Sequence, residues 1–272
     1  MSEKEIIKLA EEAIRRGFKT IVLQSGEDPF WTAKRLSEVV REIKRLGAAV
    51  TLSVGELSFK DFEILKKAGA DRYLLKFETS DKKLFQRLKP DTTFEKRIEC
   101  LKFLRELDYE VGSGIIVGLP GQTKESLKRD ILLMKELDLD MIGIGPFLPH
   151  KDTPLGNYPK GDYHLTLRML SLSRIFLPYA NIPATTALDG VCKNGRLNAL
   201  EYGPNVLMPD ITPPEYRTFY LIYPEKRRIT LSPLEELKKE LERRGFVLSC
   251  ERGDSLAWQK RKINKKLSME FR

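Results

Sequence analysis

Short apolar runs alternate along this chain with longer stretches in which apolar residues recur every three or four positions. The short runs are typical of buried strands, and the longer pattern is typical of helices that cover a sheet. The first strand is predicted at Thr20–Gln24, after an amphipathic helix at Glu3–Arg16. Alternation of this kind predicts βα units and a parallel sheet.

Seven strands are predicted in this way, and a helical pattern follows most of them. They begin near residues 20, 48, 73, 110, 141, 182 and 205. A closed (β/α)8 barrel has eight parallel strands. We therefore expect an α/β fold, a TIM-type (β/α)8 barrel whose first β/α unit is missing, over residues 1–224.

The C-terminal residues 225–272 are expected to form a separate, small α/β piece. Ser232 and Glu235 have the spacing of a capping box, which predicts a helix that runs to about Arg244. A short strand is predicted at Phe246–Ser249, and a basic segment follows it.

Composition places the chain among ordinary globular proteins. Of its 272 residues, 41% are hydrophobic and 32% are charged, and no apolar run is long enough to span a bilayer. The N-terminal residues form a charged amphipathic helix and not a signal peptide. We therefore expect a cytoplasmic protein without membrane contact. The three cysteines lie far apart and are expected to be reduced thiols.

The net charge of +9 raises the question of an anionic partner. Most Lys and Arg residues alternate with Glu along the helices, which is the pattern of solvated helical faces. Only residues 259–266, QKRKINKK, form a basic cluster. The sequence therefore disfavours a nucleic-acid-binding function.

Polar side chains follow three successive predicted strands. Glu27, Glu56 and Glu78 come directly after them, and Arg97 lies in a later helix. Because the carboxyl ends of parallel strands meet at one edge, these residues can face one cavity. Each of them alone also fits a helix cap or a surface charge. His150 and His164 are not spaced as metal ligands, so no metal site is predicted.

Longer sequence strings are more informative about the family than these single residues. They include TIVLQSGEDP, AGADRYLLKFET, LKPDTTFEKR, GIIVGLPGQT, MIGIGPFLPHKDTPL, NIPATTA and GPNVLMP. In this order, over nearly all of residues 1–225, they resemble a radical SAM family, the HydE-type maturases of FeFe-hydrogenase. Biotin synthase and methylornithine synthase are relatives of that family.

The resemblance implies a barrel that binds S-adenosylmethionine beside a 4Fe–4S cluster held by a CxxxCxxC loop. By their positions in the matching strings, six residues look like the family's adenosylmethionine contacts. Gln24, Ser25 and Glu27 match the amino-group motif, Glu78 and Arg97 the residues at the ribose and the methionine carboxylate, and Ile116 the adenine wall. The cavity residues that meet the substrate are matched by Thr51, Ser53, Lys76, Thr185 and Thr186.

The family's activity is implied in the same way. It acts in hydrogenase maturation through cleavage of adenosylmethionine to a 5′-deoxyadenosyl radical. The implied partners are a small-molecule or organometallic substrate and other hydrogenase maturases. The chain departs from the family in two places. It contains no CxxxCxxC, and Lys76 and Phe77 stand where the family tends to have arginine and histidine.

The missing strand and the missing cluster loop are expected to be one missing piece. Three explanations of this missing piece remain open: a gene start placed too late, a shortened chain and a degenerate paralogue. We favour the first. Two alternative functions also remain open. One is a non-catalytic protein that binds adenosylmethionine or a partner protein, and the other is an enzyme similar to biotin synthase or methylornithine synthase.

Overall fold

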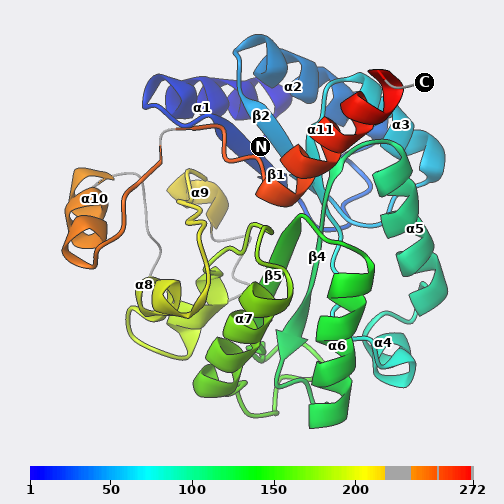
Figure 1. Cartoon of the computed structure of the whole chain (residues 1–272), viewed down its shortest axis with the longest axis vertical. Helices are drawn as coiled ribbons and strands as arrows, with labels where there is room; N and C mark the ends of the chain where they lie inside the picture. Colours follow the sequence, from blue (N-terminus) through cyan, green and yellow to red (C-terminus); the bar gives the residue numbers. More distant parts are fainter. Residues whose placement is uncertain (218–233, 250, 271–272) are drawn as a thin grey trace.

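The computed structural model describes residues 1–217, 234–249 and 251–270 (Figure 1). Its centre is a sheet of five parallel strands in the order β1-β2-β3-β4-β5. The strands are β1 (Thr20–Gln24), β2 (Ala49–Ser53), β3 (Arg72–Leu74), β4 (Glu110–Val117) and β5 (Met141–Pro146). Sequential order in a parallel sheet is the arrangement of a barrel wall, so the strands form half of a TIM-like barrel.

Seven helices connect and flank the strands, and α5, α6 and α7 lie beside one another in Figure 1. They are α1 (Glu3–Arg15), α2 (Ala33–Arg45), α3 (Phe59–Lys67), α4 (Lys82–Leu88), α5 (Phe94–Glu106), α6 (Lys124–Glu136) and α7 (Tyr163–Phe176). Short polar side chains cap them, as expected for helix starts. At α5 the cap is Thr93, whose hydroxyl accepts from the Lys96 N–H at 3.1 Å.

The two faces of the sheet differ in character. Residues such as Val50, Leu52 and Ile142 belong to the apolar core that the helices cover. Since side chains alternate along a strand, the residues between them face the inside of the half-barrel. On β4 and β5 the central inner positions are glycines: Gly112, Gly114, Gly143 and Gly145. The middle of the inner face of these two strands therefore has no side chains of its own.

The sixth and seventh strands were predicted at Ile182–Ala187 and Asn205–Met208. Among the described residues only isolated parallel bridges occur there, Met141 to Asn181 and Pro183 to Val206. Pro183 has no N–H to donate to a ladder. The Thr185 hydroxyl donates to the Ile144 carbonyl, with 3.0 Å between the two oxygens. The prediction of seven full strands is therefore wrong for the described residues.

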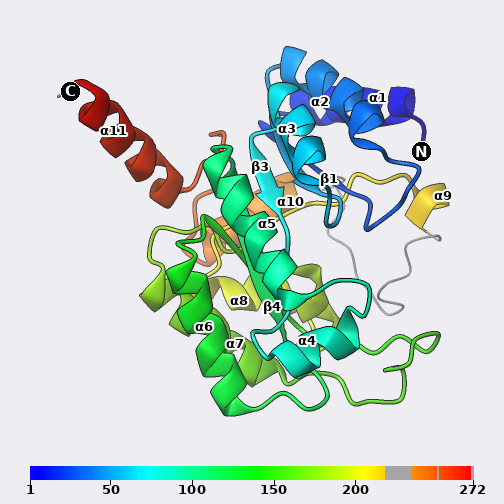
Figure 2. The same cartoon turned by 90° about the vertical axis from the view of Figure 1, so that its right-hand side faces the viewer.

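Short helices follow this region: η1 (Thr186–Gly190), α8 (Gly195–Ala199), η2 (Leu200–Tyr202) and α9 (Pro214–Arg217). The predicted boundary between residues 224 and 225, and the capping serine Ser232, lie outside the described residues. Beyond them come α10 (Leu234–Arg243) and α11 (Leu256–Glu270), and α11 projects from the body in Figure 2. The predicted strand Phe246–Ser249 is wrong, because this segment has no regular structure and packs Phe246 and Leu248 on the core.

The segment before α11 closes the amino-terminal end of the sheet. Arg72 and Glu110, on neighbouring strands, form a buried ion pair at 2.7 Å, and Arg72 also pairs with Asp254 at 2.5 Å. The basic segment at the start of α11 is partly paired as well, since Arg261 and Lys262 contact aspartates of the barrel. No helix in the described ranges is long and apolar enough to cross a membrane.

Candidate functional site

Arg97 is the centre of a cluster of charges at the carboxyl end of the sheet. It lies in α5, and its side chain is 3% exposed. Its Nε donates to Glu56 Oε2 at 2.7 Å, and its Nη1 donates to the Lys76 carbonyl at 2.7 Å. Its Nη2 is buried, makes no hydrogen bond with any residue that the structure describes, and lies 3.9 Å from Glu27 Oε1. One donor group of this arginine is therefore free to take an acceptor.

Glu78 follows β3 and lies beside β4. Its backbone N–H donates to the Gly114 carbonyl at 2.9 Å, and its carbonyl accepts from the Ile116 N–H at 3.0 Å. The side-chain Oε2 lies 2.9 Å from the Lys76 ammonium as an ion pair. The same oxygen is buried and has no hydrogen bond of regular geometry with the described residues. It can therefore accept one from a ligand.

The backbone of Glu78 is in the left-handed region, with φ of 61°. For a non-glycine residue this conformation costs about 1–2 kcal/mol. Such strain persists only where the surroundings hold it, and it is frequent at binding sites. Here the strained residue is a glutamate, although a glycine could adopt the same backbone conformation without strain.

The loop after β1 brings Glu27, but not Gln24, to the arginine. Glu27 packs against Gly55, where an added Cβ would lie 2.3 Å from Glu27 Cγ. Its carboxylate lies 3.6 Å from the Lys89 ammonium. Ser25 is tied to β2 by its N–H, which donates to the Ser53 carbonyl at 3.4 Å. Gln24 is exposed at the end of β1.

The predicted cavity residues occupy inner positions of the half-barrel. On β2, Thr51 and Ser53 alternate with core residues and so share the inner face. Lys76 extends over β5, since a Cβ on Gly143 would lie 3.7 Å from its Cδ. Thr185 lies against Gly145. Thr186, at the start of η1, is half-buried and lies next along the chain.

Ile116 belongs to a second apolar cluster beside the charged groups. The buried members of this cluster are Leu84, Leu119 and Phe147, and the half-buried Ile116 packs against them. Leu155, from the loop after β5, joins the same cluster. An apolar surface therefore adjoins the carboxylates and the arginine, which suits a ligand with a charged end and a flat apolar end.

Sequence reasoning missed two partners within this site. Glu56 was noted at a strand end, but its ion pair with Arg97 could not be inferred, because the two residues are 41 positions apart. Asp130, a buried carboxylate in α6, was not identified at all. It accepts from the Ser80 N–H at 2.5 Å, two residues beyond Glu78.

Comparison with known sequences decides the family. The profile of the Radical SAM superfamily matches residues 1–145. The chain belongs to the radical SAM superfamily. Enzymes of this superfamily use S-adenosylmethionine and a 4Fe–4S cluster.

Among curated relatives, the radical SAM chain is 54% identical over 226 residues to the FeFe-hydrogenase maturase subunit HydE of Thermotoga maritima. The match covers 83% of this chain and 65% of that protein. The 3-methylornithine synthase of Methanosarcina acetivorans is 29% identical over 210 residues, or 76% of this chain and 59% of the relative. The chain therefore spans about two thirds or less of the length of these relatives.

Solved structures agree on the radical SAM fold. The crystal structure of methylornithine synthase (PylB) superposes with a TM-score of 0.80 at 25% identity, covering 93% of this chain and 74% of that one. The maturase HydG from Carboxydothermus hydrogenoformans gives a TM-score of 0.69 at 22% identity, covering 93% and 62%. The half-barrel is thus the TIM-like fold of this superfamily.

The described residues do not fit a 4Fe–4S cluster, and Cys250 lies outside them. Such a cluster needs several closely placed thiolates. Cys100 is buried inside α5, where burial raises the pKa of its thiol to about 11, and Cys192 lies in a distant loop. In the described ranges no three His, Cys, Asp or Glu residues are grouped as metal ligands.

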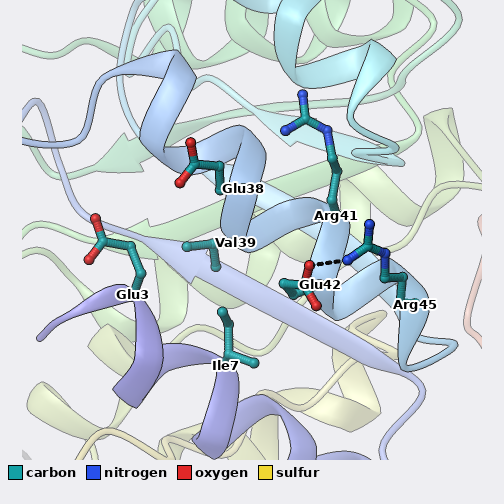
Figure 3. A pocket seen from close by; sticks show the side chains of 7 residues that line it. All are labelled: Glu3, Ile7, Glu38, Val39, Arg41, Glu42 and Arg45. Atoms are coloured by element: carbon teal, nitrogen blue, oxygen red, sulfur yellow. Dashed lines mark hydrogen bonds and ion pairs between the residues drawn. The ribbon is translucent and has the colours of Figure 1, made fainter.

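A separate cavity between α1 and α2 lies on the outside of the molecule (Figure 3). Three glutamates and two arginines line it, together with Ile7 and Val39. One of the arginines, Arg45, is already paired with Glu42. Because this cavity is remote from the carboxyl ends of the strands, we do not assign it to the function.

Proposed function

We propose that this protein binds S-adenosylmethionine at the carboxyl ends of its strands. Two buried polar atoms that have no hydrogen-bond partner among the described residues support this proposal, an acceptor on Glu78 and a donor on Arg97. Adenosylmethionine carries ribose hydroxyls that donate and a carboxylate that accepts. Glu78 would accept from the ribose, and Arg97 Nη2 would donate to the carboxylate.

The remaining site residues take supporting roles in this proposal. Glu27 would attract the ammonium group of the ligand, with Gln24 and Ser25 on the same loop. Ile116 would contact the adenine. The inner-face residues Thr51, Ser53, Lys76, Thr185 and Thr186 would meet the second substrate.

The ion pairs in the site limit how the ligand can bind. Glu56 already occupies Arg97 Nε and the Lys76 carbonyl occupies Nη1, so both two-pronged contacts that arginine can make through Nη2 would have to displace one of these bonds. Lys76 already neutralises Glu78. A ligand must compete with both pairs, and this predicts weak binding by the chain alone.

We further propose that the protein acts in FeFe-hydrogenase maturation, as a radical SAM enzyme of the HydE type. The 54% identity with HydE supports this proposal. Its substrate would be a small or organometallic molecule, and its partners other cytoplasmic maturases. Since the cysteines do not fit the cluster, we derive no reaction step through it.

The second candidate function is adenosylmethionine binding without cleavage. The chain has the residues that we propose to face the ligand, whereas it has only three cysteines and no CxxxCxxC. The two functions differ in whether the bound ligand is broken. Reconstitution with iron and sulfide, followed by assays of iron content and 5′-deoxyadenosine, separates them. A stoichiometric cluster with 5′-deoxyadenosine release would rule out the second candidate.

Calorimetry with adenosylmethionine tests the binding proposal itself. We expect a Kd of about tens of micromolar or weaker, or roughly −6 kcal/mol. A charge-assisted hydrogen bond contributes about 1.5–3 kcal/mol, so Glu78→Ala and Arg97→Ala should each weaken binding about tenfold to a hundredfold. Lys96→Ala, an exposed change on the same helix as Arg97, is the control and should leave the Kd unchanged.

Two results would contradict the proposed site. Nanomolar binding would mean that the ligand is held by stronger contacts than these. Binding that neither Glu78→Ala nor Arg97→Ala weakens would place the ligand elsewhere. Thermal unfolding of each variant shows whether a loss of binding reflects loss of the fold.

A further inference from the structure

The segment from β3 to α4 carries Glu78 and is attached to its surroundings on two sides. On the β4 side, Gly114 and Ile116 bond to the backbone of Glu78, and the Phe77 N–H donates to the Ser113 hydroxyl at 3.1 Å. These contacts reach no further than Glu78. The left-handed turn at Glu78 also needs a fixed point beyond it, or it can relax toward an ordinary conformation.

Asp130 of α6 provides that second attachment. Its carboxylate Oδ1 accepts from the Ser80 N–H at 2.5 Å. The residue is fully buried, and its Oδ2 has no hydrogen-bond partner within the described part of the chain. Two other contacts join the same elements more weakly. The Ser80 hydroxyl lies 3.4 Å from the Ser126 carbonyl, and the outward-facing Arg129 lies 3.8 Å from Asp81.

An aspartate at this position is unfavourable for the helix alone. Asp is a poor residue for a helix interior, and a buried carboxylate loses its hydration. Burial accordingly raises the pKa of Asp130 to about 6. The residues that flank its face of α6, Leu127, Ile131 and Met134, are apolar core residues. The core would therefore accept an apolar residue, and the contact with Ser80 is what the carboxylate adds.

We propose that Asp130 is a positioning residue for Glu78, which holds the Glu78 turn in its left-handed conformation through the Ser80 N–H and so aims the Glu78 carboxylate at the ligand. Asp130 itself does not touch the ligand. The proposal rests on the proposed function in its last step only, because the effect on the Glu78 turn is independent of any ligand.

The experiment compares two kinds of substitution in the full chain. Asp130→Asn keeps a side-chain oxygen that can accept from Ser80. Asp130→Ala removes this acceptor. Asp130→Ser also removes it but perturbs the helix less, because a serine hydroxyl can donate to a carbonyl of its own helix. Arg129→Ala is the control, since it removes only the long, exposed ion pair with Asp81.

Two measurements are made on each variant that unfolds cooperatively. Amide hydrogen exchange at residues 78–81 reports on the turn without ligand, and calorimetry reports the Kd for adenosylmethionine. We expect Asp130→Ala and Asp130→Ser to lose protection at these amides by about tenfold or more and to bind about tenfold more weakly. Asp130→Asn and Arg129→Ala should stay within about threefold of the parent protein on both measurements.

The outcomes distinguish failure of this inference from failure of the proposed function. Unchanged protection in Asp130→Ala or Asp130→Ser would overturn the positioning role, whatever the Kd. Lost protection with an unchanged Kd would overturn the link from the turn to the ligand. If the parent protein does not bind adenosylmethionine, the proposed function fails, and the exchange data still decide whether Asp130 holds the turn. Equal losses in Asp130→Asn and Asp130→Ala would also overturn the inference, because rescue requires the acceptor.

Discussion

Replacing Arg72 by methionine should destabilise the protein strongly, because Arg72 joins three parts of the chain in a buried place. Its Nε donates to Glu110, its Nη1 to the Thr20 hydroxyl at 3.0 Å, and its Nη2 to Asp254 and to the Arg252 carbonyl at 3.1 Å. The side chains of Arg72 and Glu110 are 3% and 2% exposed. Water cannot replace these contacts without opening the amino-terminal end of the sheet.

The size of this loss of stability is set by Glu110, the charged partner that remains buried when Arg72 is replaced. Removing one partner of a buried ion pair costs about 3–5 kcal/mol, because the other charge stays buried and uncompensated. In Arg72→Met that charge is Glu110, which keeps only the Ser255 N–H at 2.9 Å. An exposed pair contributes about 0–1 kcal/mol, so Arg45→Met, which breaks the surface pair with Glu42, is the matched control.

The loss should depend on pH. Burial raises the pKa of Glu110 above its ordinary value of 4.5, and nearby Asp140 raises it further, while Arg72 lowers it. With a raised pKa in the folded state, Glu110 favours folding when protonated, and this contribution is lost as the pH rises through the folded pKa. Arg72→Met removes the lowering cation, so the destabilisation should be largest at pH 8 and smaller at pH 5.

Urea unfolding at the two pH values measures both effects. The double variant Arg72→Met with Glu110→Leu should recover much of the stability, since an apolar pair can replace a buried ion pair. A loss of less than about 1 kcal/mol at pH 8, or the same loss at both pH values, would refute the reasoning. Failure of the double variant to recover stability would show that Asp254 and Thr20, and not Glu110, are the critical partners.

Three further predictions concern single residues. Cys100, with its pKa raised to about 11 by burial, should resist iodoacetamide in the native protein and react only after unfolding, as mass spectrometry of a Cys192→Ser, Cys250→Ser background would show. Gly114→Ala should prevent normal folding, because its Cβ would lie 2.0 Å from the Gly143 carbonyl oxygen, and native-like circular dichroism and urea unfolding of this variant would contradict that contact. Glu78→Gly should raise the free energy of unfolding by up to about 1 kcal/mol, because it removes left-handed strain, and it should weaken adenosylmethionine binding. A lower free energy of unfolding would mean that the carboxylate stabilises the fold.

Elements with a clear period were predictable from the sequence. The starts of the first five strands were located to within one residue, because apolar runs between helical patterns leave few alternatives. The third strand ends at Leu74, three residues before its predicted end at Phe77. The sixth and seventh were not formed as full strands. Their apolar runs look similar, but Pro183 cannot donate to a ladder, the Thr185 hydroxyl donates to the Ile144 carbonyl, and the Asn205 side-chain oxygen accepts from the Ile182 N–H. These side-chain bonds take the place of ladder bonds. Such substitutions depend on tertiary contacts, which no local pattern reports.

The candidate site was predictable in its members and not in its connections. Matching strings pointed to Glu78 and Arg97, and the structure places both at the carboxyl end of the sheet. That Glu56 and Lys76 would neutralise them could not be predicted, because ion pairs between distant segments leave no periodic signal. The predicted roles of these residues toward a ligand remain predictions.

The backbone of Glu78 shows why a site can escape a reading of the sequence. A glutamate after a strand looks like a helix cap or a surface charge, and its letter carries no information on φ. In the structure Glu78 has a strained left-handed backbone, and its buried Oε2 is paired with Lys76 but makes no hydrogen bond of regular geometry with the described residues. The adjacent segment is bound by the buried carboxylate of Asp130. Each of these is unfavourable for folding alone, and a glycine at residue 78 with an apolar residue at 130 would avoid all three. Their coincidence within a few residues argues that the position of the Glu78 carboxylate, and not the stability of the turn, is what this part of the chain maintains.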